Sequence, residues 1–478
     1  MIRGLVVSTA CLAITGHAMG WRTFSFEAPI KDAGSVRATL SSGLDRDGNV
    51  HMAWVQTDSS KIDRLMYAKF LRADTTVSIE QIPAPADSIK HAPDLFLSSA
   101  GNIHIAWFAD RTRKTSTNTG NSAVYHAQKL AGGWDLSQVS TNPLDWRSSQ
   151  WSRFACYVVG APTQFEWQGA LTVAYKADAA DSTNWDHHMI LARKQGGGWL
   201  RTEELNLDSL LGQTGENNGP HFPASCGARV MAGKIDISEY RPSLLVRDEK
   251  WREIQYPQFH HVLGGNKSME IHNLPGGKLL MAWAGMDSSR MRWAIIGPDL
   301  SVRFDSIKVG NSISGNIAGS AADSVDGSIH FLTPDYNGNI RIHSSLQGGG
   351  GFIETVLPDA GIGIPYGRRS LHALAGRQAA VTASATAKRI YVTLSDSTQV
   401  GIHSKRGVSP FSVRRTSLGV EISSAQSGRW ECAVLTIDGR KIGGLATRSS
   451  QAAIPVPNGF HLIRIQWAGG SSNHVVWK

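Results

Sequence analysis

The stretch LDRDGNVHMAW at residues 44–54 recurs three times along the chain in altered form. Residues 97–107 read LSSAGNIHIAW, residues 273–283 read NLPGGKLLMAW, and residues 323–333 read DSVDGSIHFLT. A weaker copy has Tyr175 six residues after Gly169, where three of the stronger copies have tryptophan. A unit of roughly 50 residues with alternating apolar positions is typical of one blade of a β-propeller. The repeat therefore predicts an all-β chain whose functional residues gather at one end of a central channel.

Seven blades account for the chain up to residue 407, each with four strands counted from the channel outwards. In two divergent copies we expect the innermost strands at 154–159 and 223–230. The seventh blade shows only three strands of its own, at 379–384, 389–394 and 400–405. The segment GWRTFSFEAP at 20–29 resembles the outer strands of other copies, such as GGWDLSQVS. We therefore expect the N-terminal strand to close the seventh blade from outside, because closure of the ring removes exposed strand edges.

Composition limits the class of protein. The 478 residues carry a formal net charge of +9, with the basic residues spread along the chain rather than in runs. We therefore expect no nucleic-acid partner, while a basic surface suits an acidic substrate or an acidic cell surface. No CxxC pair is present to hold zinc, and we expect no metal at the site and no cofactor, while the sequence leaves a structural calcium ion open. Cys156 and Cys226 are expected on equivalent strands, either as a disulfide or as two buried thiols.

The first 20 residues have the pattern of an export signal. Arg3 gives a basic start, a run of apolar and small residues extends from Leu5 to Ile14, and Gly20 lies at a plausible cleavage point. The run is too short to span a bilayer, and no later segment is long and apolar enough to do so. We therefore expect a mature monomer that begins near Trp21 and is secreted or held at the outer-membrane surface.

The blade repeat stops after residue 407. Residues 408–478 contain short expected strands, at 419–423, 430–437, 453–455 and 460–467, and end in HVVWK at 474–478, without the blade pattern. We expect a separate, small Ig-like β-sandwich here. The chain thus divides into an export signal at 1–20, a propeller at 21–407 and a β-sandwich at 408–478.

Two segments of the tail and its last residue form a known pattern. They are AVLTIDGRKI at 433–442, PNGFHLIRI at 457–465, and Lys478. In these residues the tail resembles the sorting domain of the type IX secretion system, although the usual Asn-Pro opening is absent. The resemblance implies that the secretion machinery is a partner of the tail. The alternative is a carbohydrate-binding or spacer sandwich.

Two turns of the propeller carry a degenerate Asp-box pattern, LDRDG at 44–48 and SVDG at 324–327. In these turns the propeller resembles the sialidase-like, BNR-repeat superfamily. The chain departs from that family in lacking its Arg-Ile-Pro opening and its placed sialate arginines. The resemblance therefore implies a carbohydrate-active propeller and permits a polysaccharide lyase, without implying a true sialidase.

His51, His104 and His330 share one position of the repeat. Three histidines are a familiar metal-ligand set, but each of these lies in the middle of a strand in a different blade. Because a repeated position implies repeated packing, we expect them to make structural hydrogen bonds between blades.

The loops before the innermost strands and after the second strands share one face of a propeller. The residues expected there to bind substrate are Arg153, Arg241, Arg111, Trp151, Trp185, Asp110, Asp178 and Glu270. Arginine forks bind carboxylate or sulfate, and aromatic faces stack on sugar rings. The pattern predicts a site for an acidic polysaccharide or glycan, and the long loops at 136–152, 178–188 and 206–221 place it between the second and fourth blades.

Two kinds of catalysis fit these residues. In a lyase, Tyr240 or His221 would abstract the proton beside a uronate carboxylate and His91 would be the partner acid. In a glycoside hydrolase, two carboxylates drawn from Asp110, Asp178, Glu239 and Glu270 would act together. Glu239 is singled out because it lies six residues after Gly233, where other copies have an aromatic residue. A non-catalytic lectin or adhesin and a protein-binding propeller remain the alternatives.

Overall fold

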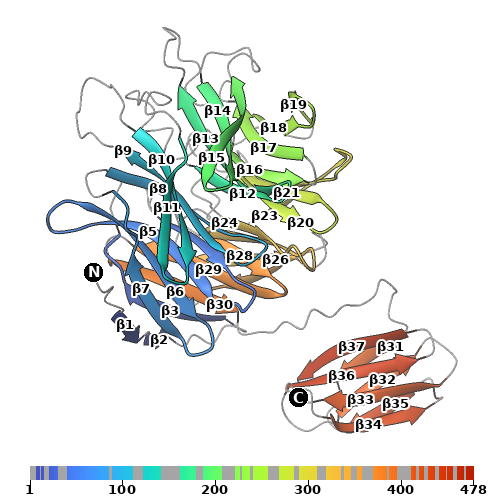
Figure 1. Cartoon of the computed structure of the whole chain (residues 1–478). Helices are drawn as coiled ribbons and strands as arrows, with labels where there is room; N and C mark the ends of the chain where they lie inside the picture. Colours follow the sequence, from blue (N-terminus) through green and yellow to red (C-terminus); the bar gives the residue numbers. More distant parts are fainter. Residues whose placement is uncertain are drawn as a thin grey trace. The chain divides into compact units, whose positions relative to one another are not determined.

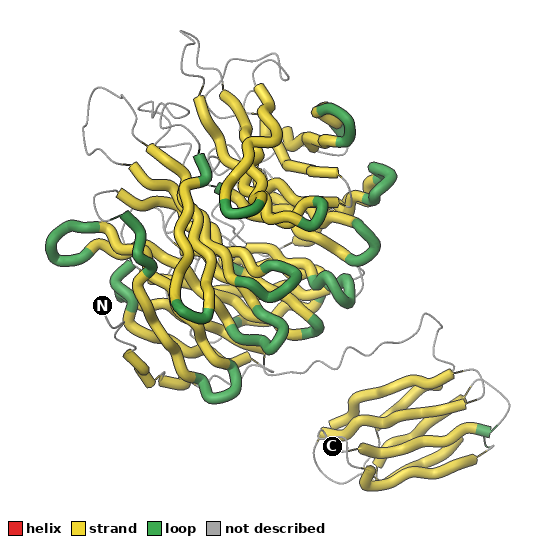
Figure 2. Tube along the Cα trace, viewed as in Figure 1, coloured by secondary structure: helices red, strands yellow, loops and turns green. Residues whose placement is uncertain are grey.

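The computed structural model describes most strands and the short turns between them. The described residues are 7–10, 12–14, 21–30, 40–85, 89–110, 122–140, 162–178, 187–206, 221–226, 229–236, 241–256, 269–284, 290–308, 319–334, 339–345, 352–357, 370–384, 387–395, 411–415, 419–424, 429–435, 441–447, 449, 451–455, 460–467 and 470–477. Their regular structure is strand throughout, as Figure 2 shows, and no helix among them is long and apolar enough to cross a membrane. The chain falls into two compact units, Met1–Ser397 and Thr398–Lys478.

The first unit is a seven-bladed β-propeller, which confirms the predicted architecture (Figure 1). Blades 1 to 3 are formed by β4 (Leu40–Leu44), β5 (Val50–Thr57), β6 (Asp63–Leu71) and β7 (Thr76–Gln81); β8 (Ile89–Leu97), β9 (Ile103–Asp110), β10 (Ser122–Leu130) and β11 (Gly133–Gln138); and β12 (Thr163–Trp167), β13 (Ala170–Asp178), β14 (His187–Gln195) and β15 (Gly198–Asn206). Blades 4 to 6 are formed by β16 (His221–Cys226), β17 (Arg229–Asp236), β18 (Arg241–Arg247) and β19 (Trp251–Ile254); β20 (Met269–Leu274), β21 (Lys278–Ala284), β22 (Arg290–Ile296) and β23 (Val302–Lys308); and β24 (Gly319–Ala322), β25 (Ile329–Pro334), β26 (Ile340–Ser345) and β27 (Ile353–Val356). Each innermost strand contacts the innermost strands of the two neighbouring blades, so these strands enclose a central channel.

The N-terminal strand closes the ring as predicted. Blade 7 contains β28 (Leu371–Leu374), β29 (Arg377–Ser384), β30 (Arg389–Ser395) and, on the outside, β3 (Trp21–Glu27). In Figure 1 the blue β3 lies beside the orange β30, and their register pairs Trp21 with Ser395 and Glu27 with Arg389. Two further strands, β1 (Val7–Ala10) and β2 (Leu12–Ile14), pair with the outer edges of β7 and β3. Both come from the segment that the sequence predicts to be an export signal.

The innermost strands of three blades differ from the sequence prediction, and in blade 4 the predicted 223–230 is divided between β16 and the start of β17. In blade 7 the segments 379–384 and 389–394 form the second and third strands, because the innermost strand is Leu371–Leu374, while 400–405 lies outside the described residues. In blade 3 the innermost strand is Thr163–Trp167, and the predicted 154–159 also lies outside the described residues. In both blades the innermost strand is the segment directly before the short turn that leads into the second strand, because such a turn makes its two flanking strands pair antiparallel.

Blade 4 corrects the reason for choosing Glu239. Its first hairpin turns between Cys226 and Arg229, so Gly233 lies inside β17 and is not the turn glycine. The second strand starts at Ala170 in blade 3 and at Arg229 in blade 4. Tyr175 in blade 3 therefore corresponds to Lys234 in blade 4. The interpretation of Glu239 as an aromatic position replaced by a carboxylate is therefore wrong, and Glu239 itself lies outside the described residues.

Aromatic residues of the repeat form the core between blades. Trp54, Trp107 and Trp283 are each buried to 1% exposure or less. Trp54 belongs to a cluster that includes Phe26 of the closing strand, with ring centroids 6.2 Å apart. Burying a large apolar side chain stabilises a fold by about 1.5–3 kcal/mol, so the repeated tryptophan holds neighbouring blades together.

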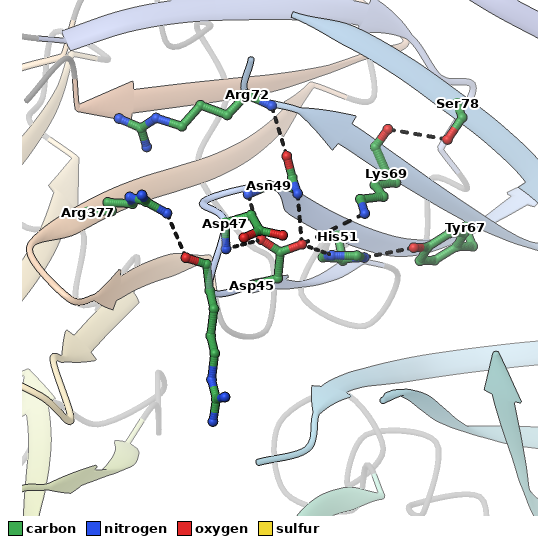
Figure 3. Close-up of polar contacts among 10 residues, drawn as sticks. Asp45, Asp47, Asn49, His51, Tyr67, Lys69, Arg72, Ser78 and Arg377 are labelled. Atoms are coloured by element: carbon green, nitrogen blue, oxygen red, sulfur yellow. Dashed lines mark hydrogen bonds and ion pairs between the residues drawn. The ribbon is translucent and has the colours of Figure 1, made fainter. Parts of the chain in front are cut away.

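The turns between first and second strands form a belt of contacts between blades. Arg46 Nη2 donates to the carbonyl oxygen of Ser99 in blade 2 at 2.8 Å, and Arg377 Nη1 of blade 7 donates to the carbonyl oxygen of Arg46 at 2.6 Å. Asp45 Oδ2 accepts hydrogen bonds from Asn49 Nδ2 at 2.9 Å and His51 Nε2 at 3.1 Å (Figure 3). Burial alone would raise the pKa of Asp45, but these hydrogen bonds outweigh it and lower the pKa well below its ordinary value. The turn at residues 44–48 is therefore structural.

The repeat-position histidines are structural, but their hydrogen bonds lie within blades rather than between them. His51 Nδ1 pairs with the hydroxyl of Tyr67 at 2.7 Å, as Figure 3 shows, and His104 Nδ1 pairs with His126 Nε2 at 3.1 Å. His330 bonds Ser328 and Ser344 at 2.8 and 2.9 Å. All four partners belong to the blade of the histidine, and no group of three metal-ligating side chains is found among the described residues.

The second unit contains two antiparallel sheets. One has the order β31 (Phe411–Arg415), β32 (Gly419–Ser424), β35 (Gln451–Pro455); the other has the order β34 (Lys441–Thr447), β33 (Trp430–Leu435), β36 (Phe460–Trp467), β37 (Gly470–Trp477). Ile422 and Ile454 of the first sheet share one apolar cluster with Trp430 and Ile465 of the second. The sequence prediction missed β31 and β34.

Candidate functional site in the central channel

The strand registers identify one equivalent position on every innermost strand. It is the residue that pairs with the histidine of the repeat on the second strand, or with the residue at the same position where a blade lacks that histidine. In blade 1 it is Gly43, opposite His51, and in blade 2 it is Phe96, opposite His104. The same register gives the positions of Phe165, Ala224, His272, Ala321 and His372 in the five remaining blades. We call these seven residues the channel ring.

Six of the seven channel-ring residues line one pocket of about 210 Å³ inside the channel. The exception is Gly43, where a Cβ atom would come within 2.8 Å of Leu95 Cδ2, so β4 packs closely against β8. The ring is chemically two-sided. Blades 2 and 3 contribute Phe96 and Phe165, and blades 5 and 7, on the other side of the seven-fold ring, contribute His272 and His372. The channel ring thus has an aromatic wall opposite a wall with two imidazoles, and Thr163 and Gln164 of blade 3 also line the pocket.

Two residues before the channel ring, three innermost strands carry a hydrogen-bond acceptor for the next blade. Ser41 Oγ accepts from Leu95 N at 3.0 Å, and Asp94 Oδ2 accepts from Gln164 N at 2.7 Å. Glu270 Oε2 accepts from Ser320 N at 2.5 Å. We call Ser41, Asp94 and Glu270 the clasp residues, because each ties its innermost strand to the following one.

Glu270 is the clasp residue that lines the pocket, and it belongs to a small polar cluster. Its Oε2 also accepts the hydroxyl of Ser320 at 2.6 Å, and the Ser320 oxygen lies 2.8 Å from His272 Nε2. Burial would raise the pKa of Glu270, but the hydrogen bonds from His272 and Ser320 outweigh it and hold the pKa below its ordinary value. Glu270 is therefore ionised at neutral pH, with only 8% of its surface exposed.

The ionised carboxylate of Glu270 determines which groups of this cluster donate hydrogen bonds and which accept them. Glu270 can only accept, so Ser320 donates its hydroxyl proton to Oε2 and receives a proton from His272 Nε2–H. When the imidazole is neutral, His272 Nδ1 is then an acceptor. Among the described residues no hydrogen bond reaches Nδ1 of His272 or Oε1 of Glu270. Both acceptors are therefore available to a ligand.

The same geometry does not form a catalytic serine. In a Ser-His-acid triad the carboxylate bonds the histidine nitrogen that faces away from the serine. Here the carboxylate and Nε2 both contact the Ser320 oxygen, and Ser320 has no exposed surface. The cluster is a clasp with two open acceptors.

Of the twelve residues expected at the site, the side chain of Glu270 alone is described. Five others are described by backbone: His91 in β8, His221 at the start of β16, Arg241 at the start of β18, and Asp110 and Asp178 at the ends of β9 and β13. First and third strands begin where second strands end, so these positions share one edge of their blades. Tyr240, Glu239, Arg153, Arg111, Trp151 and Trp185, like Cys156, lie outside the described residues.

Sequence reasoning missed the channel ring. Its signal was present, because each ring residue lies four to six positions before the turn glycine in blades with a recognisable repeat, such as Phe96 before Gly101 and His372 before Gly376. The turns differ in length, however, and a shift by one residue moves a side chain to the other face of its strand. The register was needed to find the ring.

No protein-family model and no curated protein sequence matches the chain. Solved structures similar to it include an alpha-L-arabinanase of Penicillium chrysogenum complexed with arabinobiose, with 11% identity, TM-score 0.43, and coverage of 73% of this chain and 97% of that one. A lectin of Aleuria aurantia in complex with alpha-methyl-L-fucoside has 11% identity, TM-score 0.39, and coverage of 67% and 95%. A Hadza microbial sialidase has 11% identity, TM-score 0.39, and coverage of 81% and 95%. At this level of similarity the function has to be argued from the residues of this chain.

Proposed function

We propose that the propeller binds a carbohydrate at its central channel and takes one sugar unit into the pocket. The observation that carries this proposal is the two-sided channel ring, with Phe96 and Phe165 facing a wall that contains Glu270 and His272. A sugar ring has an apolar face that packs on aromatic side chains and hydroxyls that hydrogen-bond to fixed acceptors. The volume of about 210 Å³ is below the range of about 300–1,000 Å³ typical of pockets for larger ligands, and suits a single unit.

The experiment is a binding screen of the full chain against immobilised neutral, acidic and amino glycans, followed by a variant pair. Phe96→Ala removes half of the apolar wall and should weaken binding about tenfold, because it removes roughly 1.5 kcal/mol of buried apolar contact. Phe304→Ala is the control, since Phe304 is also half-buried but lies on the outer strand β23. Binding to no glycan, or equal loss in both variants, would contradict the proposal and favour a protein-binding propeller.

A finer proposal is that the bound glycan is an acidic polysaccharide and that the propeller cleaves it as a lyase. Tyr240 or His221 would be the base, His91 the acid, and Arg153 or Arg241 would neutralise the carboxylate. The shared blade edge of His91, His221 and Arg241 supports this proposal. A rise in ultraviolet absorbance from unsaturated uronate, abolished by Tyr240→Phe with His221→Ala, tests it.

The glycoside-hydrolase alternative uses the carboxylates of Asp110, Asp178, Glu239 and Glu270. The ionised state of Glu270 does not suit a general acid, although it is compatible with a nucleophile or base. New reducing ends without an absorbance change would favour the hydrolase. Binding without either product would leave the lectin.

We also propose that the chain is exported through its first 20 residues and sorted through an Ig-like tail at 408–478. Two sheets around one core in the second unit support the tail assignment. Mass spectrometry of the protein recovered outside the cell tests both parts, because cleavage near Trp21 would remove β1 and β2. A retained Met1 would contradict the export signal.

A further inference from the structure

One wall of the channel pocket carries two acceptors, on Glu270 and on the neutral form of His272. Oε1 of Glu270 and Nδ1 of His272 both face potential ligands as acceptors, and they lie on the same side of β20 because their positions differ by two. No lysine or arginine is among the described residues that line the pocket. A ligand group with several donors and a positive charge is therefore the best complement to this wall.

An anionic group is a poor complement to the same wall. A uronate carboxylate in the pocket would approach the ionised Glu270 with no lysine or arginine among the described lining residues, and like charges in a partly buried site repel strongly. This requirement differs from that of the blade edge, where Arg241 and the other arginines are expected to hold acidic units.

The opposite wall suits the apolar face of a sugar ring. Phe96 and Phe165 present aromatic surfaces to the pocket, on which such a face can pack. Phe165 is 5% exposed and belongs to an apolar cluster with Trp167. An amino sugar can therefore place its protonated amine on the carboxylate and the imidazole and its ring face on the aromatic wall.

We propose that the channel pocket selects an amino sugar with a free, protonated amine, held by the carboxylate of Glu270 and by Nδ1 of His272. The inference rests on the proposed binding of a carbohydrate in the channel and names the class of the bound unit. It requires no covalent step.

The test compares three sugars of equal ring size by ligand-observed NMR titration of the full chain at pH 7. They are methyl glucosaminide with a protonated amine, its neutral N-acetyl form, and methyl glucuronide with a carboxylate. We expect the glucosaminide to bind about tenfold more tightly than the N-acetyl form, because a hydrogen bond to a charged group is worth about 1.5–3 kcal/mol. The glucuronide should bind most weakly.

The variant Glu270→Gln should remove the preference for the amine while leaving binding of the N-acetyl form. Asp94→Asn is the matched control, since Asp94 is the same clasp residue in blade 2 but does not line the pocket. The control should keep the tenfold preference, and melting curves check that both variants fold. If Glu270→Gln does not fold, the comparison of the three sugars on the wild-type chain still decides the question.

Equal affinity for the amine and N-acetyl forms would overturn the inference and leave the proposed function standing. A preference for the amine that persists in a folded Glu270→Gln variant would likewise overturn the inference and leave the proposed function standing. Binding of none of the three sugars, together with no binding in the glycan screen, would overturn both.

Discussion

Asp94 and Glu270 perform the same structural task in two parts of the propeller and differ in what else they touch. Each carboxylate accepts the backbone N–H of the next innermost strand, at 2.7 and 2.5 Å. Asp94 has no exposed surface, whereas Glu270 is 8% exposed and lines the channel pocket beside His272. The longer side chain of Glu270 makes the clasp with one oxygen and leaves the other for the pocket. A repeated structural position can therefore become a ligand site in one blade through one extra methylene and one neighbouring histidine.

The largest effect should come from the fully buried clasp. Asp94→Ala removes a buried, charge-assisted hydrogen bond and leaves a small cavity, and we expect it to lower the free energy of unfolding by about 3 kcal/mol. Urea unfolding followed by tryptophan fluorescence measures this. A loss below about 1 kcal/mol would show that the clasp contributes little to stability and would remove the expected difference between Asp94 and Glu270.

Glu270→Ala should cost about half as much, roughly 1.5 kcal/mol, although it removes two hydrogen bonds to Ser320. The reason is that water in the pocket can replace the carboxylate, whereas Asp94 is sealed from solvent. The same urea titration compares the two alanine variants directly. A cost equal to or above that of Asp94→Ala would mean that the pocket does not hydrate the clasp.

Acid should affect wild type and Glu270→Gln differently. The pKa of Glu270 in the folded chain lies below the ordinary value of 4.5, so the ionised carboxylate contributes stability above that value. This contribution is lost as the pH falls through the lowered folded pKa. The unfolding free energies of the two proteins should therefore differ most above pH 4.5 and converge below it, as measured by urea unfolding across the acid range. A difference between the two unfolding free energies that stays constant across the acid range would contradict an ionised Glu270.

The smallest effect is expected for the uncharged clasp. Ser41→Ala removes the hydroxyl that accepts Leu95 N, and a neutral hydrogen bond contributes about 0.5–1.5 kcal/mol. We expect a loss of about 1 kcal/mol in thermal or urea unfolding. Ser78→Ala, at an exposed serine, is the control and should change stability by less than about 0.5 kcal/mol.

Much of the fold could be predicted because the repeat combines glycine, alternation and a buried aromatic residue. The strands of blade 5 and the ring closure by Trp21–Glu27 follow directly from that pattern. Blade 4 departs from the prediction because Gly233, which the repeat places in the turn, lies inside a strand. Local sequence does not distinguish a glycine in a strand from one in a turn when the aromatic marker is missing.

The candidate site was predicted less completely. Glu270 was selected as a rim carboxylate, and the structure places it in the channel wall as a clasp and pocket residue. Phe96, Phe165, His272 and His372 were not selected, because their common role depends on seven strands converging on one axis. Their sequence neighbourhoods have little in common apart from a turn glycine a few residues later.

The sequence by itself determined the all-β class, the blade repeat, the closing strand and the buried tryptophans, because each follows from periodicity and short-range turn chemistry. Only the tertiary structure decided which side chains meet in the channel. Register sets the face of every residue on a strand, and the seven innermost strands contact one another only after the ring has closed. The pairing of Glu270 with Ser320 and His272, and the aromatic wall opposite them, therefore exist only in the folded propeller.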